Sequence, residues 1–215
     1  MRMDSEIEQE LGDAERIAMR YTSREFRAKL STVFALDRRL AQLVAQTSEP
    51  MLGQMRLAWW RDVLAQPADA RPSGDTVLDA IGRYWDGEES SLVQLVDGWE
   101  HMLSEPPLGQ HAARAFIAGR VEAVSAIYDT PDARLAARRW ACADATAHTA
   151  QADERQTFIE MGLENAAQRV TLPTSLRGLS VLNALALRAL RRNGKPLMHG
   201  RGAAATILRV SIIGR

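Results

Sequence analysis

Two pairs of acidic residues have the spacing that brings two carboxylates to one face of a helix. Asp75 and Asp79 are four residues apart, and so are Glu160 and Glu164. Carboxylates paired in this way are suitable ligands for Mg²⁺. Asp75, however, follows Ser73–Gly74 and precedes an apolar periodic segment, which is typical of a helix N-cap with an acidic first turn. We therefore predict a structural role for the first pair and keep the second as a candidate acidic site.

The histidines and the single cysteine form no recognisable metal or nucleophile motif. None of the four histidines lies three or four residues from another, although His101 and His148 each follow an aspartate by four residues. Two ligands alone do not hold zinc. Cys142 has no base beside it, and the sequence contains no Gly-x-Ser-x-Gly, Walker or Gly-x-Gly-x-x-Gly pattern. We predict no metal and no catalytic residue from these motifs.

The segment QMRLAWWRDVLA brings tryptophan and arginine together on one predicted helix. Trp59 and Trp60 are adjacent and cannot share a helical face, so we expect one ring in the core and the other at a groove or neighbouring helix. Arg56 lies within one turn of these rings, which permits a cation–π contact, and Arg61 flanks them on the polar side. The pattern fits either helix–helix packing or a contact surface for a ligand or partner.

Apolar residues recur at helical spacing through most of the chain, whereas strand-type alternation is scarce. This pattern predicts about nine or ten helices with short connections, and hence a single all-α bundle domain over residues 1–215. Within it, residues 1–20 are expected to form a peripheral N-terminal helix and residues 196–215 a basic C-terminal tail. The β-branched segment AAATILRVSII in that tail is predicted to be helical, because no partner strand accompanies it.

The chain resembles the squalene/phytoene synthase family of head-to-head isoprenoid synthases. The resemblance rests on EPMLGQMRLAWWRDVLA, preceded by FALDRRLAQLVAQTS, and on RVTLPTSLRGLSVLNALALRAL, which is similar to the family's Arg-x-Tyr-Leu-Pro element. It covers roughly residues 20–195, with residues 34–64 the distinctive part, and it is closest to a degenerate bacterial branch related to a mitochondrial assembly factor of respiratory complex I. The resemblance implies a single all-α bundle of the isoprenoid synthase type around a central cavity.

The departures from that family concern its metal chemistry. The family's Asp-Asp-x-x-Asp motif falls on FALDRRLAQLVA, where alignment places Ala41, Gln42 and Ala45 at the acidic positions. Mg²⁺ requires oxygen ligands to hold a departing diphosphate, and alanine offers none. Asp37 lies one helical turn too early.

The family's second acidic motif is expected shortly before Arg169. Glu160 and Glu164 then fall on its outer positions, either as half of a site or as two solvated glutamates. An alternative alignment places the motif on ARRWACADATAH, with Asp144 alone. Thr171 also stands where the family usually has an aromatic residue.

The zero net charge hides an uneven distribution. Glu164 is the last acidic residue, so residues 1–164 carry −9 and residues 165–215 carry +9. The cationic region is expected to face an anionic membrane surface, a diphosphate, an acidic partner or the chain's own acidic half. Nucleic acid is not expected, because no aromatic residue follows Phe158 to stack on bases. A single cysteine, no visible secretory signal and no membrane-spanning apolar stretch favour a cytoplasmic protein, with peripheral association at the inner face of the membrane.

Three functions are compatible with these observations. The first is a non-catalytic protein that binds an isoprenoid or lipid, or assists assembly of a membrane complex such as a respiratory complex, through Arg38, Arg56, Trp59, Trp60 and Arg61. The second is an active Mg²⁺-dependent prenyltransferase with a rearranged acidic site formed by Asp37, Glu160 and Glu164. The third is a helical interaction module without a ligand pocket. We expect the first, with no cofactor; Mg²⁺ enters only under the second.

Overall fold

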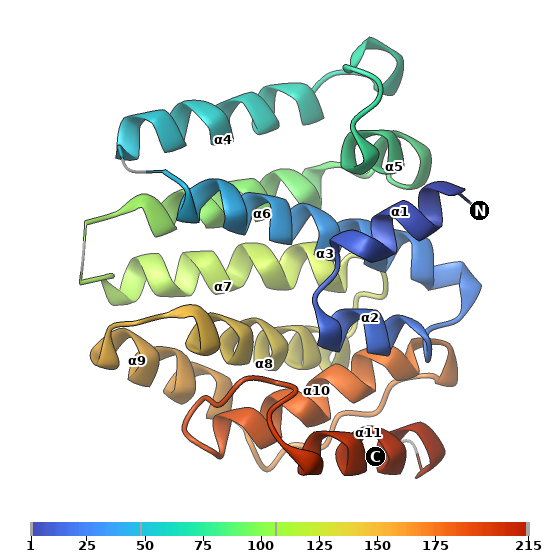
Figure 1. The fold of residues 1–215 in the computed structure, drawn as a ribbon, viewed down its shortest axis with the longest axis vertical. Coiled ribbons are helices and arrows are strands. Elements are labelled where there is room, and N and C mark those ends of the chain that lie inside the picture. Colours follow the sequence, from blue (N-terminus) through green and yellow to red (C-terminus); the bar gives the residue numbers. More distant parts are fainter. Residues whose placement is uncertain (1, 48, 106, 214–215) are drawn as a thin grey trace.

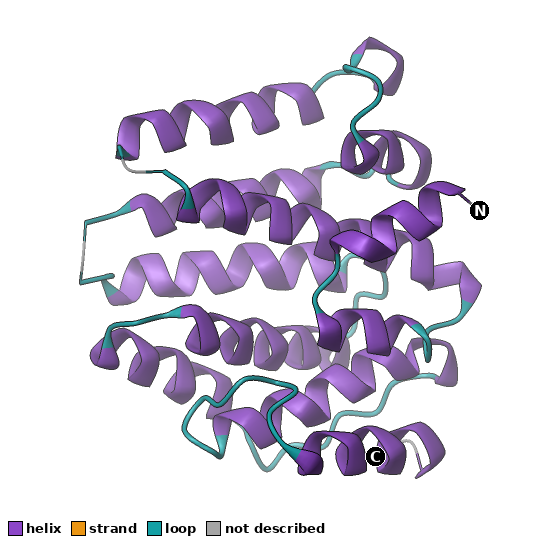
Figure 2. Cartoon of the chain, viewed as in Figure 1, coloured by secondary structure: helices purple, strands orange, loops and turns teal. Residues whose placement is uncertain are grey.

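The computed structural model describes residues 2–47, 49–105 and 107–213, and these residues form eleven α-helices and three 3₁₀ turns with no strand (Figure 2). The predicted all-α class is confirmed, with slightly more helices than expected. The α-helices are α1 (Arg2–Glu10), α2 (Asp13–Met19), α3 (Arg24–Ala45), α4 (Pro50–Leu64), α5 (Thr76–Tyr84), α6 (Ser90–Glu100), α7 (Gln110–Ser125), α8 (Pro131–His148), α9 (Ala152–Leu163), α10 (Arg177–Leu190) and α11 (Arg201–Ile213).

The longer helices are stacked along the long axis of the molecule. Figure 1 shows α4 at one end of this axis and α11 at the other, with α6, α7, α8 and α10 between them. The 3₁₀ turns occupy Ala68–Ala70, His101–Leu103 and Thr174–Leu176. One continuous apolar core runs through the stack. Within it, α3 contacts α1, α2 and α4 to α7, as well as the 3₁₀ turn at Thr174–Leu176.

Helix boundaries follow the capping residues in the sequence. Asp75 caps α5, since its side chain accepts hydrogen bonds from the backbone N–H groups of Val77 and Leu78, as predicted. Thr130 caps α8 in the same way, and Pro131 occupies the first turn, where no N–H is needed. Beyond α10, Gly194 has φ of +66° and lies so close to Thr146 that a Cβ atom would be 2.0 Å from its methyl group. A glycine is therefore required at this helix end.

The N-terminal helices are not peripheral. Residues 1–20 were expected to form one outlying helix, but α1 and α2 are separate, and Leu11, Ala18 and Met19 are fully buried. α2 packs against α3 and α10. The helical conformation was predicted correctly. Buried residues occur on both sides of Gly12, however, so the segment forms two helices that face the core rather than one surface helix.

The C-terminal segment is a packed helix rather than an extended tail. Ala203, Ile207 and Val210 of α11 are buried, and α11 packs against α10. This confirms the prediction that AAATILRVSII is helical. Its β-branched residues Ile207 and Val210 pack against α10 rather than against a strand. Across the described residues, no helix combines the length and apolar character needed to cross a membrane.

α6 and α7 cross at very close range through two glycines. A Cβ atom on Gly98 would lie 3.2 Å from the Cα atom of Gly119, and one on Gly119 would lie 2.4 Å from the carbonyl oxygen of Gln94. The two glycines let the backbones approach to a distance that any side chain would prevent. The residues that follow them, Trp99 and Arg120, are thereby brought together in the middle of the bundle.

We predict that Gly119→Ala lowers the free energy of unfolding by about 1–3 kcal/mol, because the added methyl group collides with backbone rather than with a flexible side chain. The matched control is Gly82→Ala in α5, where the nearest atom would be the Cβ of Ala68 at 3.4 Å. That change should be neutral or stabilise by up to about 1 kcal/mol, since alanine favours helix. Urea denaturation of both variants measures the difference, and equal effects would contradict the close crossing.

Candidate functional site

A central pocket of about 480 Å³ opens between α2, α3, α6, α7 and α8. This volume is within the range of small-ligand sites. The walls are largely apolar and aromatic, with polar groups at the floor and mouth. The principal apolar residues are Phe34, Val44, Trp99, Met102, Phe116 and Trp140.

The floor of the pocket is built on one buried ion pair. Arg120 Nε donates to Asp37 Oδ1 at 3.0 Å, and Arg120 Nη2 donates to Asp37 Oδ2 at 2.6 Å. Arg120 Nη2 also donates to Asp144 Oδ2 at 2.6 Å, and Nη1 to the carbonyl oxygen of Ala141 at 3.1 Å. Bidentate geometry of this kind gives the strongest guanidinium–carboxylate contact. α3, α7 and α8 are thus joined through a single side chain.

Aromatic rings surround the same guanidinium. Its carbon lies 4.4 Å from the ring centre of Trp140, 5.2 Å from Phe116 and 5.8 Å from Trp99. Trp99 also donates from Nε1 to Asp37 Oδ1 at 2.8 Å. Burial opposes the charge of Arg120, but the carboxylates of Asp37 and Asp144 outweigh it and raise the arginine's pKa above its ordinary value. The rings add cation–π attraction, so the charge is held firmly.

Glu15 on α2 supplies a second buried carboxylate. Its Oε1 accepts a hydrogen bond of 2.6 Å from Trp140 Nε1. Burial, and then the nearby carboxylate of Asp144, raise the pKa of Glu15 above its ordinary value of 4.5. Burial also raises the pKa of Asp37, against the opposing effect of Arg120. The pocket floor therefore contains more acidic groups than its one buried arginine neutralises.

The mouth of the pocket contains the α3 residues at which the resemblance would place an acidic motif. Ala41, Gln42 and Ala45 all line the pocket, on one face of α3. Arg38 lines the same mouth, is exposed, and forms no ion pair with the described residues. In the structure, Arg38, Ala41, Gln42 and Ala45 therefore surround one opening.

These residues do not fit a magnesium–diphosphate centre. Both oxygens of Asp37 are engaged by Arg120 and Trp99, and the remaining motif positions offer only the amide of Gln42. In the parts of the chain that the structure describes, no three His, Cys, Asp or Glu side chains are close enough together to hold a metal ion.

The structure does not assemble the predicted residual acidic site. Glu160 is exposed on α9 and accepts a hydrogen bond from Gln156 at 2.8 Å. Glu164 pairs with Arg138 near the surface. Neither lines the central pocket, whereas Asp37 and Asp144 do. Both side chains are exposed, Glu160 on α9 and Glu164 just beyond its end, which agrees with the interpretation as solvated glutamates.

The tryptophan pair divides as predicted, but away from the pocket. Trp60 is buried at 5% exposure, and Trp59 is 46% exposed, with the two rings 5.3 Å apart. Arg61 pairs with Asp97 and Glu100 of α6. Arg56 is exposed on α4. Of the five candidate contacts, only Arg38 therefore lines the central pocket.

The remaining candidate residues are structural. Asp79 accepts hydrogen bonds from the backbone N–H of Gly74 and supports the α5 N-terminus, as the capping prediction required. Asp97 is occupied by Arg61 rather than by His101. Burial raises the pKa of Cys142 to about 12, which keeps it an unreactive thiol.

Sequence reasoning missed Arg120, Glu15, Trp99 and Trp140. Arg120 had one available sign, since it is the only charged residue within the apolar run AFIAGRV. A cation on a core-facing helix must find a partner. Its partner is 83 residues away, however, and Glu15 is 125 residues from Trp140.

No protein-family model matches the chain, and no curated protein or solved structure matches it either.

We predict that Arg120→Met lowers the free energy of unfolding by about 3–5 kcal/mol, because it leaves Asp37 buried without its counter-charge. Adding Asp37→Leu to this variant should restore much of the loss, since the unpaired charge is then removed. The matched control is Arg134→Met, which breaks two exposed ion pairs and should cost no more than about 1 kcal/mol. Denaturant unfolding of the four proteins is the measurement; equal losses at Arg120 and Arg134 would argue against a buried pair.

Glu15→Gln is predicted to change how stability depends on pH. The raised pKa means that the folded protein binds more protons than the unfolded chain from about pH 4.5 upward to the folded pKa. The free energy of unfolding of the parent therefore falls as pH rises through that window. Glutamine still accepts a hydrogen bond from Trp140 but does not titrate. The variant should therefore gain stability relative to the parent as pH rises.

The measurement is denaturant unfolding at intervals between pH 4 and pH 8. Glu160→Gln makes the same change on the exposed face of α9 and should leave the parent curve nearly unaltered. Parallel curves for the parent and Glu15→Gln across this interval would contradict the assignment.

Proposed function

We propose that this chain is a squalene/phytoene-synthase-like protein with an isoprenoid-synthase-type bundle, which binds an isoprenoid or related lipid in its central pocket without metal-dependent prenyl transfer. The observation that carries the proposal is the composition of the α3 wall. Ala41, Gln42 and Ala45 line the pocket mouth, and Asp37 is already neutralised by Arg120. A pocket of the kind that the resemblance implies supports the proposal, and the residues that line it do not offer a set of ligands for Mg²⁺.

The chemistry of the walls supports an amphipathic ligand. Phe34, Val44 and Phe116 provide apolar surface for a hydrocarbon chain, whose transfer from water is favourable. Arg38 at the mouth is free to meet an anionic or hydroxyl head group. The ligand would therefore lie with its chain inside and its polar end outside.

The two alternatives have less support. A rearranged prenyltransferase needs Asp37, Glu160 and Glu164 around one ion, with oxygens about 2.1 Å from it, and only Asp37 lines the pocket. An interaction module without a pocket is disfavoured by the 480 Å³ cavity itself.

A role in assembling a membrane complex is the second candidate function, and the outer face of α4 favours it. Met51, Met55 and Trp59 are 72%, 64% and 46% exposed and recur every four residues, which places them on one stripe. Methionine and tryptophan are common in surfaces that bind partners.

The lipid proposal predicts saturable binding of farnesol, detected by quenching of tryptophan fluorescence because Trp99 and Trp140 line the pocket. Ala41→Phe should weaken this binding at least about tenfold, or 1.4 kcal/mol, since the ring occupies the mouth. Ala118→Phe makes the same change at an exposed position of α7 outside the pocket and should bind as the parent does.

Farnesyl diphosphate with Mg²⁺ supplies the opposing test. The proposal expects the diphosphate to be recovered unchanged. Release of pyrophosphate that disappears in Glu160→Ala would establish the prenyltransferase alternative instead, and absence of saturable farnesol binding to the parent would refute the lipid site.

A further inference from the structure

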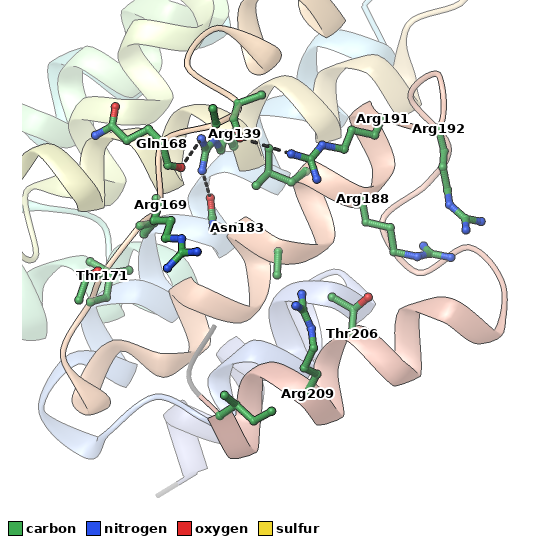
Figure 3. Close-up of a pocket in the computed structure, with 17 residues that line it drawn as sticks. Arg139, Gln168, Arg169, Thr171, Asn183, Arg188, Arg191, Arg192, Thr206 and Arg209 are labelled. Carbon is green, nitrogen blue, oxygen red and sulfur yellow. Dashed lines mark hydrogen bonds between the residues drawn. The ribbon is translucent and has the colours of Figure 1, made fainter.

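A second cavity, distinct from the central pocket, is lined by arginines. It is a groove of about 1250 Å³ between α10, α11 and the segment 166–172, with one arginine of α8 at its inner side (Figure 3). No acidic residue lines it. Its six arginines are Arg139, Arg169, Arg188, Arg191, Arg192 and Arg209.

The positive charge of this groove is not neutralised by the acidic part of the chain. Each ion pair that the described residues form joins two residues before position 165. The expectation that the two halves compensate each other is therefore not met by ion pairs. Asp132, which acts electrostatically on Arg139, accepts a hydrogen bond from the backbone N–H of Thr171 at 2.7 Å.

Arg139 is the most informative of the six. It is 1% exposed, and its Nη1 donates to Asn183 Oδ1 at 3.0 Å, while Nη2 donates to the carbonyl oxygens of Asn165 and Gln168 at 2.7 and 3.0 Å. All these acceptors are neutral, and Nε has no partner. Burial and the nearby charge of Arg191 lower the pKa of Arg139.

A second donor in the groove is also unsatisfied. Arg188 Nη1 is buried without a hydrogen-bond partner, although its Nη2 donates to the carbonyl oxygen of His199 at 2.9 Å. Buried donors on charged groups are costly when unpaired. Figure 3 shows Arg169 and Arg209 beside the same opening, from different elements. The arrangement is suited to an anion with several acceptor oxygens, which is the chemistry of a phosphate.

The outer surface of α11 adds an apolar ridge next to this groove. Leu208, Ile212 and Ile213 are 61%, 70% and 60% exposed. Ile213 and Arg209 line the groove, whereas Leu208 and Ile212 lie on the face of the helix opposite to the buried Ile207. A helix with cations beside exposed branched aliphatic residues fits the interface of an anionic bilayer. Single-stranded nucleic acid is a poorer match, because no aromatic side chain lines the groove.

We propose that the arginine-lined groove binds the phosphate of an anionic lipid head group while the Leu208–Ile212 ridge of α11 enters the membrane interface. This site is separate from the central pocket and does not depend on the function proposed for it. It goes beyond the overall charge asymmetry, because it names one groove and one helix face.

The test is cosedimentation with vesicles of phosphatidylcholine alone or with phosphatidic acid. The parent should bind only the anionic vesicles. Arg169→Gln/Arg209→Gln should weaken binding roughly 30-fold, since each basic side chain near an anionic surface contributes about a factor of five. Neither side chain forms a hydrogen bond or ion pair with another described residue, so this double variant should fold, which thermal unfolding checks. Leu208→Ser/Ile212→Ser should also lose binding, while its groove remains cationic.

The matched control is Arg83→Gln/Arg114→Gln, which removes the same charge from exposed positions on α5 and α7 and should bind like the parent. Equal loss of binding in this control would show that only the overall charge matters, and would contradict a specific site in the groove.

Binding of inorganic pyrophosphate without any binding of vesicles would assign the groove to a soluble phosphate compound. Tighter binding of single-stranded RNA than of vesicles would assign it to nucleic acid. Either result overturns the proposal. Ala41→Phe leaves the groove unchanged, so failure of the farnesol experiment and failure of this one are distinguishable.

Discussion

The ion pair between Asp37 and Arg120 determines what the centre of this molecule can do. Both side chains are almost completely buried, and the guanidinium also holds Asp144 and a carbonyl oxygen of α8. Breaking such a pair costs more than the pair itself contributes, because a lone buried charge remains. The carboxylate that neutralises Arg120 is thereby unavailable to a metal ion. The same contact fixes three helices around the pocket and keeps both oxygens of Asp37 hydrogen-bonded within the protein.

The helical class and several boundaries could be predicted because they depend on neighbours in the sequence. The cap at Asp75 and the helix end at Gly194 are set by residues within a few positions. The separation of Trp59 from Trp60 likewise follows from helix geometry alone. The residues of α3 that line the pocket could be predicted only from the resemblance, because the sequence pattern alone does not indicate which face of a long helix lies against a cavity.

The floor of the pocket could not be predicted, because its partners meet only in the folded chain. Glu15 finds Trp140, and Arg120 finds Asp37, across separations that no local pattern encodes. The two interpretations of Glu160 and Glu164, half of a site or two solvated glutamates, could not be separated for the same reason. Their spacing fixes that they share a helix face, but only the packing of α9 against α8 decides that the face is turned to water.

The placement of α4 and α11 at opposite ends of the long axis has a consequence for how the protein meets its surroundings (Figure 1). The apolar stripe of Met51, Met55 and Trp59 and the ridge of Leu208 and Ile212 therefore lie on helices at opposite ends of the molecule. If the protein binds a bilayer through α11, then α4 lies at the far end of the long axis, where it is exposed to the aqueous phase.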